Sequence, residues 1–224
     1  MHISDGLLSP LICALMYAVS ATFLIWAWKK AKATYSRSLT PILAVSSAFV
    51  FAAQMINFPI PYGTSGHLVG GTFLAVVLGP YAAILSMTIV LMIQALFFAD
   101  GGIFAFGANV FNMAVIGGLS YFLIKTLTKN FTKKGWLLPS VFAASWLSVV
   151  LGALSCALQI GFSPAFSEVG GILATVPAML FWHVIIGVGE AAITTTVVSQ
   201  LGRIQPTVLN GLARFGRVQN ERIP

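Results

Sequence analysis

A histidine follows the first residue of the chain, in a sequence that contains three histidines in all: His2, His67 and His183. Imidazole is the most common metal-binding side chain. The amine of Met1, the backbone nitrogen of His2 and the His2 imidazole can close two fused chelate rings around one ion, so one further nitrogen would complete a set of four. The alternative is that His2 belongs to a loose terminus without a ligand role. The choice depends on whether the fold brings a second histidine to the terminus.

The composition is that of a membrane protein. The chain is 58% hydrophobic and 8% charged, whereas a typical soluble domain carries about 25% charged residues. Its apolar runs are close to the ~20 residues that a helix needs to cross a bilayer. The sequence therefore predicts an all-α membrane protein, a seven-transmembrane-helix bundle that forms one metal-binding domain over residues 1–224.

Seven spans are expected, at residues 7–28, 39–56, 68–79, 81–99, 104–127, 138–162 and 171–201. At about 1.5 Å per residue the third is too short to cross unless its outer end starts below the membrane surface. The preceding residues 57–67 contain prolines and glycines, which disfavour regular helix. Irregular backbone at membrane depth must be buried in protein or hydrated. We expect this loop to be irregular and to dip into the bundle.

The charged residues predict the orientation. The twelve Lys and Arg residues fall into three groups, within residues 29–37, 125–134 and 203–222; Asp5 lies before the first group, and Asp100 and Glu168 lie between the groups. Because cytoplasmic joints collect Lys and Arg, the N-terminus should be outside and the tail, 203–224, cytoplasmic. The first apolar run has no positive charge before it, so we expect it to be retained rather than cleaved as a signal peptide. The net charge of +7 suits an inner surface that faces anionic lipid, without nucleic acid as a partner.

This orientation places the N-terminal segment, residues 1–6, and His67 on the same side of the membrane. The expected ligands are the Met1 amine, the deprotonated backbone nitrogen of His2, the His2 imidazole and the His67 imidazole. Four nitrogens in one plane suit Ni(II) or Cu(II), whereas Zn(II) prefers a tetrahedron. The alternative for His67 is a hydrogen-bonded histidine at a helix start. Polar side chains expected to support the imidazoles are Asn57, Thr64, Ser65, Asn109 and Asn112.

Two further sets of residues are candidates for function. His183 and Glu190 lie within the last span, where ionisable groups often serve function, and they could form a polar brace, a proton relay or a metal-ligand pair. Ala44, Ala48 and Ala52 recur every four residues and form a face small enough for close helix packing, either within the bundle or with a partner subunit. The sequence contains no Gly-Lys-Ser/Thr phosphate loop and no hydrolase motif. It predicts a protein that is not an enzyme and has no ATPase site of its own.

Several longer motifs resemble a known family. They are Met1-His2-Ile3 with Asp5-Gly6, Asn57-Phe58-Pro59 leading to Gly63-Thr64-Ser65-Gly66-His67-Leu68, Phe97 with Ala99-Asp100-Gly101-Gly102, and Gly107-Ala108-Asn109-Val110-Phe111-Asn112-Met113. Across the whole chain the sequence resembles the nickel/cobalt substrate-binding membrane subunits of energy-coupling-factor transporters, called NikM or CbiM. The resemblance implies seven helices, a terminus carried into the bundle, and metal held by Met1, His2 and His67.

The resemblance also implies partners and a location. Such a subunit works in the prokaryotic cell membrane with a coupling membrane subunit and a pair of ABC-type ATPases, and a small accessory membrane subunit is an open further partner. Ala44, Ala48 and Ala52 would form the coupling face. The expected function is the capture of nickel, with cobalt a close second, as transported cargo without a resident cofactor. Two alternatives are a secondary carrier that uses His183 and Glu190 with an ion gradient, and a membrane metal sensor.

Overall fold

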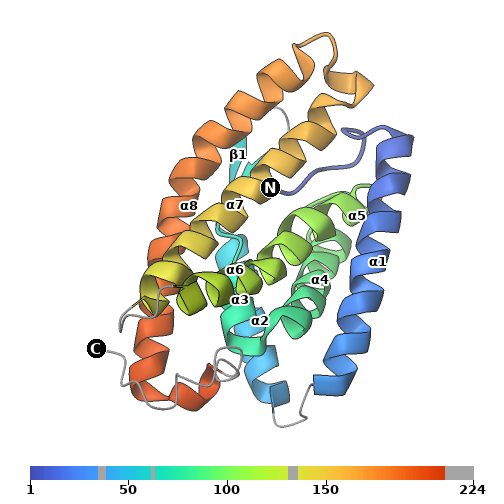
Figure 1. Ribbon diagram of the computed structural model, residues 1–224. Coiled ribbons are helices and arrows are strands. Elements are labelled where there is room, and N and C mark those ends of the chain that lie inside the picture. Colours follow the sequence, from blue (N-terminus) through green and yellow to red (C-terminus); the bar gives the residue numbers. More distant parts are fainter. Residues whose placement is uncertain (35–38, 62–63, 131–135, 210–224) are drawn as a thin grey trace.

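The structure is a computed structural model that describes residues 1–34, 39–61, 64–130 and 136–209. It is a bundle of helices with one small hairpin (Figure 1). The helices are α1 (Pro10–Thr34), α2 (Thr40–Gln54), α3 (Gly71–Leu78), α4 (Pro80–Phe97), α5 (Phe106–Asn109), the π-helical η2 (Val110–Val115), α6 (Ile116–Asn130), α7 (Leu137–Gly161) and α8 (Gly171–Ile204). The strands are β1 (Phe58–Ile60) and β2 (Thr64–Gly66), and short 3-10 turns occupy Pro164–Phe166 and Pro206–Val208.

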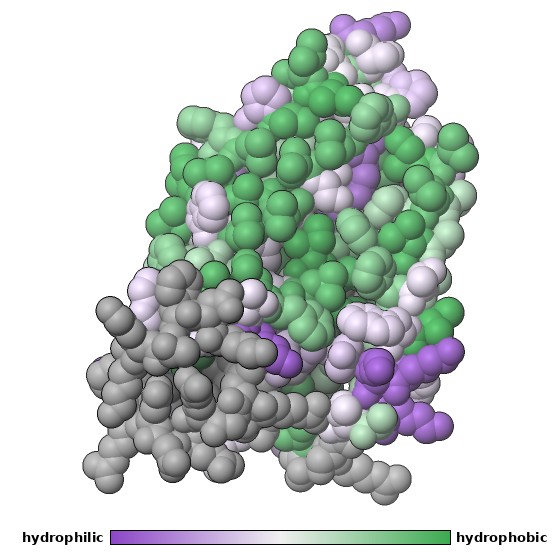
Figure 2. All heavy atoms as spheres, in the orientation of Figure 1, coloured by the Kyte–Doolittle hydropathy of each residue, from purple (hydrophilic) through white to green (hydrophobic). Residues whose placement is uncertain are grey.

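Five helical segments among the described residues are long and apolar enough to cross a membrane. They are Pro10–Thr34, Pro80–Phe97, Phe106–Thr128, Leu137–Gly161 and Gly171–Ile204. Helix α2 has 15 residues and α3 has eight, so both are shorter than a full crossing. Apolar side chains cover most of the face in Figure 2, as expected for a surface in contact with lipid. The count of seven spans and the sides of the two termini stay predictions.

Local sequence accounts for several helix boundaries. Helix α4 starts at Pro80 directly after Gly79, which has a φ of +83°, so the chain turns sharply between α3 and α4. Proline suits the first helical position because its missing N–H has no partner there in any helix. Helix α8 has 34 residues in all and is not interrupted at Pro177. The last apolar stretch is therefore a single helix.

The prediction that the loop between α2 and α3 is irregular is wrong in one respect, because this loop contains two paired strands. Phe58 pairs with Gly66, Pro59 with Ser65 and Ile60 with Thr64 in an antiparallel ladder. Strand pairing satisfies backbone groups that water cannot reach inside a bundle. Within this hairpin, Ile60 and Thr64 are buried, whereas Phe58 is exposed. The loop does enter the bundle, and its second strand leads directly to His67.

Helix α3 is the centre of the bundle, and all eight of its residues are buried. It packs closely on α6: a Cβ added to Gly71 would lie 2.7 Å from the Cα of Gly117. A helix too short to cross the bilayer is tolerated there because protein surrounds it. The start of α3, and His67 before it, consequently lie inside the protein.

The N-terminal segment runs from the N-terminal end of α1 into the bundle (Figure 1). Met1, His2 and Ile3 are all buried, with at most 3% of each residue exposed. The C-terminal ends of α1 and α8 both lie at the lower end of the molecule in Figure 1. Lys32 is in the last turn of α1 and Arg203 in the last turn of α8. Of the predicted cytoplasmic tail, residues 210–224 lie outside the described residues.

Candidate metal site

Contacts on both sides of His2 fix the N-terminus inside the bundle. The side chain of Met1 packs on α7, where a Cβ added to Gly152 would lie 3.2 Å from the Met1 methyl group. The thiol of Cys156 points to the Met1 carbonyl at 3.9 Å. Asn109 accepts a hydrogen bond from the backbone N–H of Ile3 at 2.8 Å and donates one to the Ile3 carbonyl at 3.0 Å. The terminus therefore lies as an ordered segment between α5 and α7.

Asp5 ties the same segment to the start of α5. Its carboxylate accepts hydrogen bonds from the backbone N–H groups of Ile103, Phe104 and Ala105 at 2.9, 2.7 and 3.2 Å. These are the unpaired N–H groups that precede or begin a helix, where a negative charge is favourable. Asp5 thus sets the direction in which residues 1–4 enter the bundle.

Three of the four expected ligand nitrogens converge on one atom. The hydroxyl oxygen of Ser65 lies 3.4 Å from the Met1 amine, 3.3 Å from the backbone nitrogen of His2 and 3.5 Å from its Nδ1. The Met1 amine also donates a hydrogen bond to the Ser65 carbonyl. The three nitrogens of the predicted chelate therefore face a common point, which is next to the second strand of the hairpin.

The fourth nitrogen, Nε2 of His67, faces the Met1 amine at 2.9 Å. Its Nδ1 lies 2.8 Å from the Leu68 carbonyl. Since a carbonyl oxygen can only accept, Nδ1 carries the proton and Nε2 keeps its lone pair. With metal–nitrogen distances of about 2.0 Å, two adjacent ligands lie ~2.8 Å apart in a planar site and ~3.3 Å apart in a tetrahedral one. The observed separation matches the planar value, although a hydrogen bond accounts for it equally.

Gln94 of α4 and Asp100 of the loop after α4 contact the ring of His2. Its Nε2 lies 3.2 Å from Oε1 of Gln94, and its Nδ1 lies 3.2 Å from Oδ1 of Asp100. If Nε2 donates to Gln94, then Nδ1 keeps the lone pair that the chelate needs, and the Asp100 carboxylate faces this lone pair. A cation bound beside Nδ1 and the carboxylate would stabilise the two acceptors at this distance. The rings of His2 and His67 are nearly parallel, at 24°, with their centres 4.6 Å apart.

Burial keeps the nitrogens of the site neutral. Desolvation lowers the pKa of the Met1 amine to about 5 and the pKa of His2 to about 3. Burial also holds the pKa of His67 well below its usual value, and the nearby N-terminal amine and His2 act in the same direction. Burial raises the pKa of Asp100. At neutral pH the amine and both imidazoles therefore offer lone pairs, which is the form that binds metal.

The predicted supporting residues have different positions. Asn57 donates to Oδ2 of Asp100 at 3.3 Å, and Asn109 holds Ile3 as described. Thr64 bonds Met179 at 3.0 Å. Asn112 pairs with Gln159 at 2.8 Å, and its side chain has no bond to the terminus among the described residues. Sequence reasoning missed Gln94 and did not assign Asp100 to the site. A glutamine in the apolar run of α4 is the signal that could have found Gln94.

His183 and Glu190 point to different partners on the buried face of α8. Nδ1 of His183 lies 2.8 Å from the carbonyl of Met179, and its Nε2 has no hydrogen-bond partner among the described residues. The Glu190 carboxylate accepts hydrogen bonds from the backbone N–H groups of Val69 and Gly70. Glu190 is thus linked to the residues that follow His67.

Two observations bear on the remaining candidates. Ala44, Ala48 and Ala52 lie on an exposed face of α2, beside the exposed side chains of Val45 and Phe49.

In the part of the chain that the structure describes, no group of three or more His, Cys, Asp or Glu side chains could hold a metal. Together, the fold and the site define a membrane protein with a buried set of nitrogen donors.

Comparison with known proteins identifies the family. Residues 2–208 match the family described as cobalt uptake substrate-specific transmembrane region, and the chain belongs to it. It is 36% identical to the fused nickel transport protein NikMN of Rhodobacter capsulatus, over 93% of this chain and 64% of that protein. A Methanocorpusculum labreanum protein provisionally named cobalt transport protein CbiM 1 is 32% identical over 100% of this chain and 96% of its own length. A crystal structure of a transition metal transporter matches with a TM-score of 0.85 and 36% identity, over 99% of this chain and 100% of that one.

Proposed function

We propose that this protein is the substrate-binding membrane subunit of an energy-coupling-factor importer for a divalent transition metal, with nickel favoured and cobalt second. Its metal site consists of the Met1 amine, the backbone nitrogen and Nδ1 of His2, and Nε2 of His67. The observation that carries the proposal is the convergence of the first three nitrogens on the Ser65 hydroxyl, with His67 at 2.9 Å from the amine. The proposal takes Met1 as the first residue of the protein in the cell.

Charge balance supports this ligand set. A divalent ion bound to one deprotonated backbone nitrogen keeps one net positive charge. The carboxylate of Asp100 lies 3.2 Å from Nδ1 of His2 and can neutralise it. A buried charge is costly unless it is paired, so the neighbouring carboxylate favours an occupied site over a bare cation in the bundle.

Partners follow from the proposed role. The described residues include no phosphate-binding loop of the Gly-Lys-Ser/Thr type, so energy must come from elsewhere. We assign it to ABC-type ATPases, joined through a coupling membrane subunit that packs on the exposed face of Ala44, Ala48 and Ala52. In this arrangement the N-terminus is outside, the C-terminus is cytoplasmic, and the metal enters from outside.

The two alternatives have less support. A gradient-driven carrier needs a proton path, but His183 and Glu190 bond to different main-chain groups, seven residues apart on α8. A sensor without transport would share the metal site. Uptake in vesicles separates all three: the importer needs the ATPase partners, the carrier transports alone, and the sensor does not transport.

The first test is metal content. The protein is purified with an untouched N-terminus after growth with nickel and cobalt, and bound metal is measured against a preparation that carries a tag before Met1. We expect nearly one metal ion per untagged chain and little in the tagged preparation. An untagged protein that binds neither nickel nor cobalt would contradict the proposal.

A further inference from the structure

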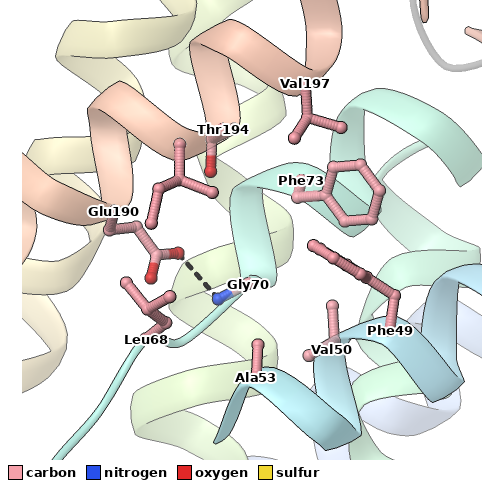
Figure 3. A pocket seen from close by; sticks show the side chains of 10 residues that line it. Phe49, Val50, Ala53, Leu68, Gly70, Phe73, Glu190, Thr194 and Val197 are labelled. Carbon is pink, nitrogen blue, oxygen red and sulfur yellow. Dashed lines mark hydrogen bonds between the residues drawn. The ribbon is translucent and has the colours of Figure 1, made fainter.

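The main chain after His67 is held from two sides by side chains of other helices. Gln54 of α2 donates from Nε2 to the Val69 carbonyl at 2.6 Å. Glu190 of α8 accepts from the N–H of Val69 at 2.5 Å with one oxygen and from the N–H of Gly70 at 2.7 Å with the other. Figure 3 shows the carboxylate directed at Gly70 beside Leu68. Residues 68–70 are thus clamped between α2 and α8.

From these contacts we infer that Glu190 is a positioning residue for His67, acting through the peptide bond between Leu68 and Val69. That peptide group is planar, so its N–H and its carbonyl keep a fixed relation. Its N–H donates to Glu190, and its carbonyl faces Nδ1 of His67 at 2.8 Å. The chain of contacts therefore runs from the carboxylate through one peptide group to the imidazole. The inference rests on the proposed function, in which Nε2 of His67 binds the metal.

We call this chain of contacts, from Glu190 through the Leu68–Val69 peptide group to His67, the relay. It sets both the orientation and the basicity of the His67 imidazole. A fixed carbonyl keeps the proton on Nδ1, which leaves the lone pair on Nε2 toward the Met1 amine. Hydrogen bonds in a chain polarise one another, so the negative charge of Glu190 strengthens the acceptor that His67 uses. Metal-bound histidines commonly donate their second nitrogen to a carboxylate or carbonyl, and loss of such a partner typically costs about 10–100-fold in metal affinity.

Glu190 lies in largely apolar surroundings. Glu190 is 2% exposed and borders a cavity of about 30 Å³ lined mainly by apolar side chains, including Phe49, Val50 and Phe73 (Figure 3). Gly70 has a φ of +76° and precedes α3 without a side-chain cap of its own. The N–H groups at this helix start therefore depend on Glu190. A buried carboxylate in a membrane protein is costly and usually serves function.

Glu190→Gln tests the relay, because glutamine offers one acceptor oxygen where the carboxylate offers two and places an N–H₂ group against an N–H donor. Nickel affinity is measured by competition with a chromophoric chelator, and the visible absorption band of bound Ni(II) reports the ligand field. We expect affinity to fall about 10–100-fold and the band to shift. A purely structural role would lower the folded fraction and leave the band of the folded protein in place.

Glu168→Gln is the matched control, because Glu168 is exposed in the turn before α8, and we expect no change in affinity or band. Unchanged affinity and band in Glu190→Gln overturn the inference. If that variant does not fold, Glu190→Asp is compared instead. It keeps the charge on a shorter side chain, and we expect a smaller loss in the same direction; binding equal to the unaltered protein would count against the relay.

A metal-free measurement separates this inference from the proposed function. Nitrogen NMR of the imidazoles reports which ring nitrogen of His67 carries the proton. We expect the Nδ1-protonated form in the unaltered protein and a mixture of forms in Glu190→Gln. The same tautomer in both proteins overturns the relay whether or not metal binds, whereas an unaltered protein that binds no metal contradicts the proposed function alone.

Discussion

In the proposed metal site, the position of His2 in the chain matters as much as its side chain. Its backbone nitrogen and Nδ1 both face the hydroxyl of Ser65, at 3.3 and 3.5 Å, and the Met1 amine faces the same oxygen at 3.4 Å. Only a histidine directly after the terminal amine can offer these three nitrogens within one compact chelate. A histidine one position later would place a further backbone nitrogen between the amine and the imidazole and would change the chelate rings.

One glycine placed before Met1 tests this dependence. The extra residue moves the terminal amine away from the His2 nitrogens. Loss of a group that supports a metal ligand typically lowers affinity about 10–100-fold, and we expect nickel affinity to fall by more than that. Affinity is measured by chelator competition. A glycine inserted after Glu168, in the exposed turn before α8, should leave affinity unchanged. Equal affinity in both variants would show that binding does not require a free amine at Met1.

At the scale of elements, the site depends on how segments distant in sequence meet. The terminus lies between α5 and α7, the hairpin supplies Ser65, α4 supplies Gln94, and the connection to α3 supplies His67. Asn109 links α5 to the terminus through two hydrogen bonds, one with the backbone N–H of Ile3 and one with its carbonyl. The element that holds the terminus therefore differs from the elements that hold His67.

Asn109→Ala should weaken metal binding without unfolding the protein. The change removes two buried hydrogen bonds to Ile3, and a buried group left unpaired costs about 1–3 kcal/mol. We expect nickel affinity to fall by roughly tenfold or more, since about 1.4 kcal/mol corresponds to tenfold. Chelator competition measures it.

Asn112→Ala is the comparison for this prediction. Asn112 lies three residues on, in the π-helical segment, and bonds Gln159. We expect a lower melting temperature and nearly unchanged nickel affinity. If both variants lose affinity equally, Asn109 acts through general packing and the anchoring role is wrong.

At the scale of the whole molecule, the proposed function assigns a partner subunit to the exposed face of α2. Ala48 lies in the middle of this face, and a small side chain there lets another helix approach closely. The nitrogens of the proposed metal site lie inside the bundle, so a change on the outside of α2 can separate coupling from binding.

Ala48→Trp should therefore block transport and spare binding. We expect ATP-dependent uptake by the reconstituted assembly to fall by at least roughly tenfold, equivalent to ~1.4 kcal/mol of lost association, with nickel affinity of the isolated subunit unchanged. Isotope uptake in vesicles measures the first quantity. Leu11→Trp on α1, where Leu11 is 78% exposed, is the control for added surface bulk. Equal uptake by the two variants would contradict a docking role for this face.

The family motifs and the apolar runs determined much of this description from sequence. They predicted the membrane bundle, the long helices to within a few residues at most ends, the shortness of α3 and the entry of the N-terminus into the bundle. These features follow from hydrophobic pattern, proline and glycine positions and local motifs, all of which act over short stretches of chain.

Other features were decided by the tertiary structure, because they depend on which segments meet. The residues before His67 form a paired hairpin, η2 adopts π-helical geometry, and Gln94 and Asp100 contact the His2 ring. Glu190 bonds the backbone after His67 rather than His183. No pattern in the sequence specifies a hydrogen bond across 121 residues, since it forms only where packing brings a buried carboxylate against unpaired N–H groups.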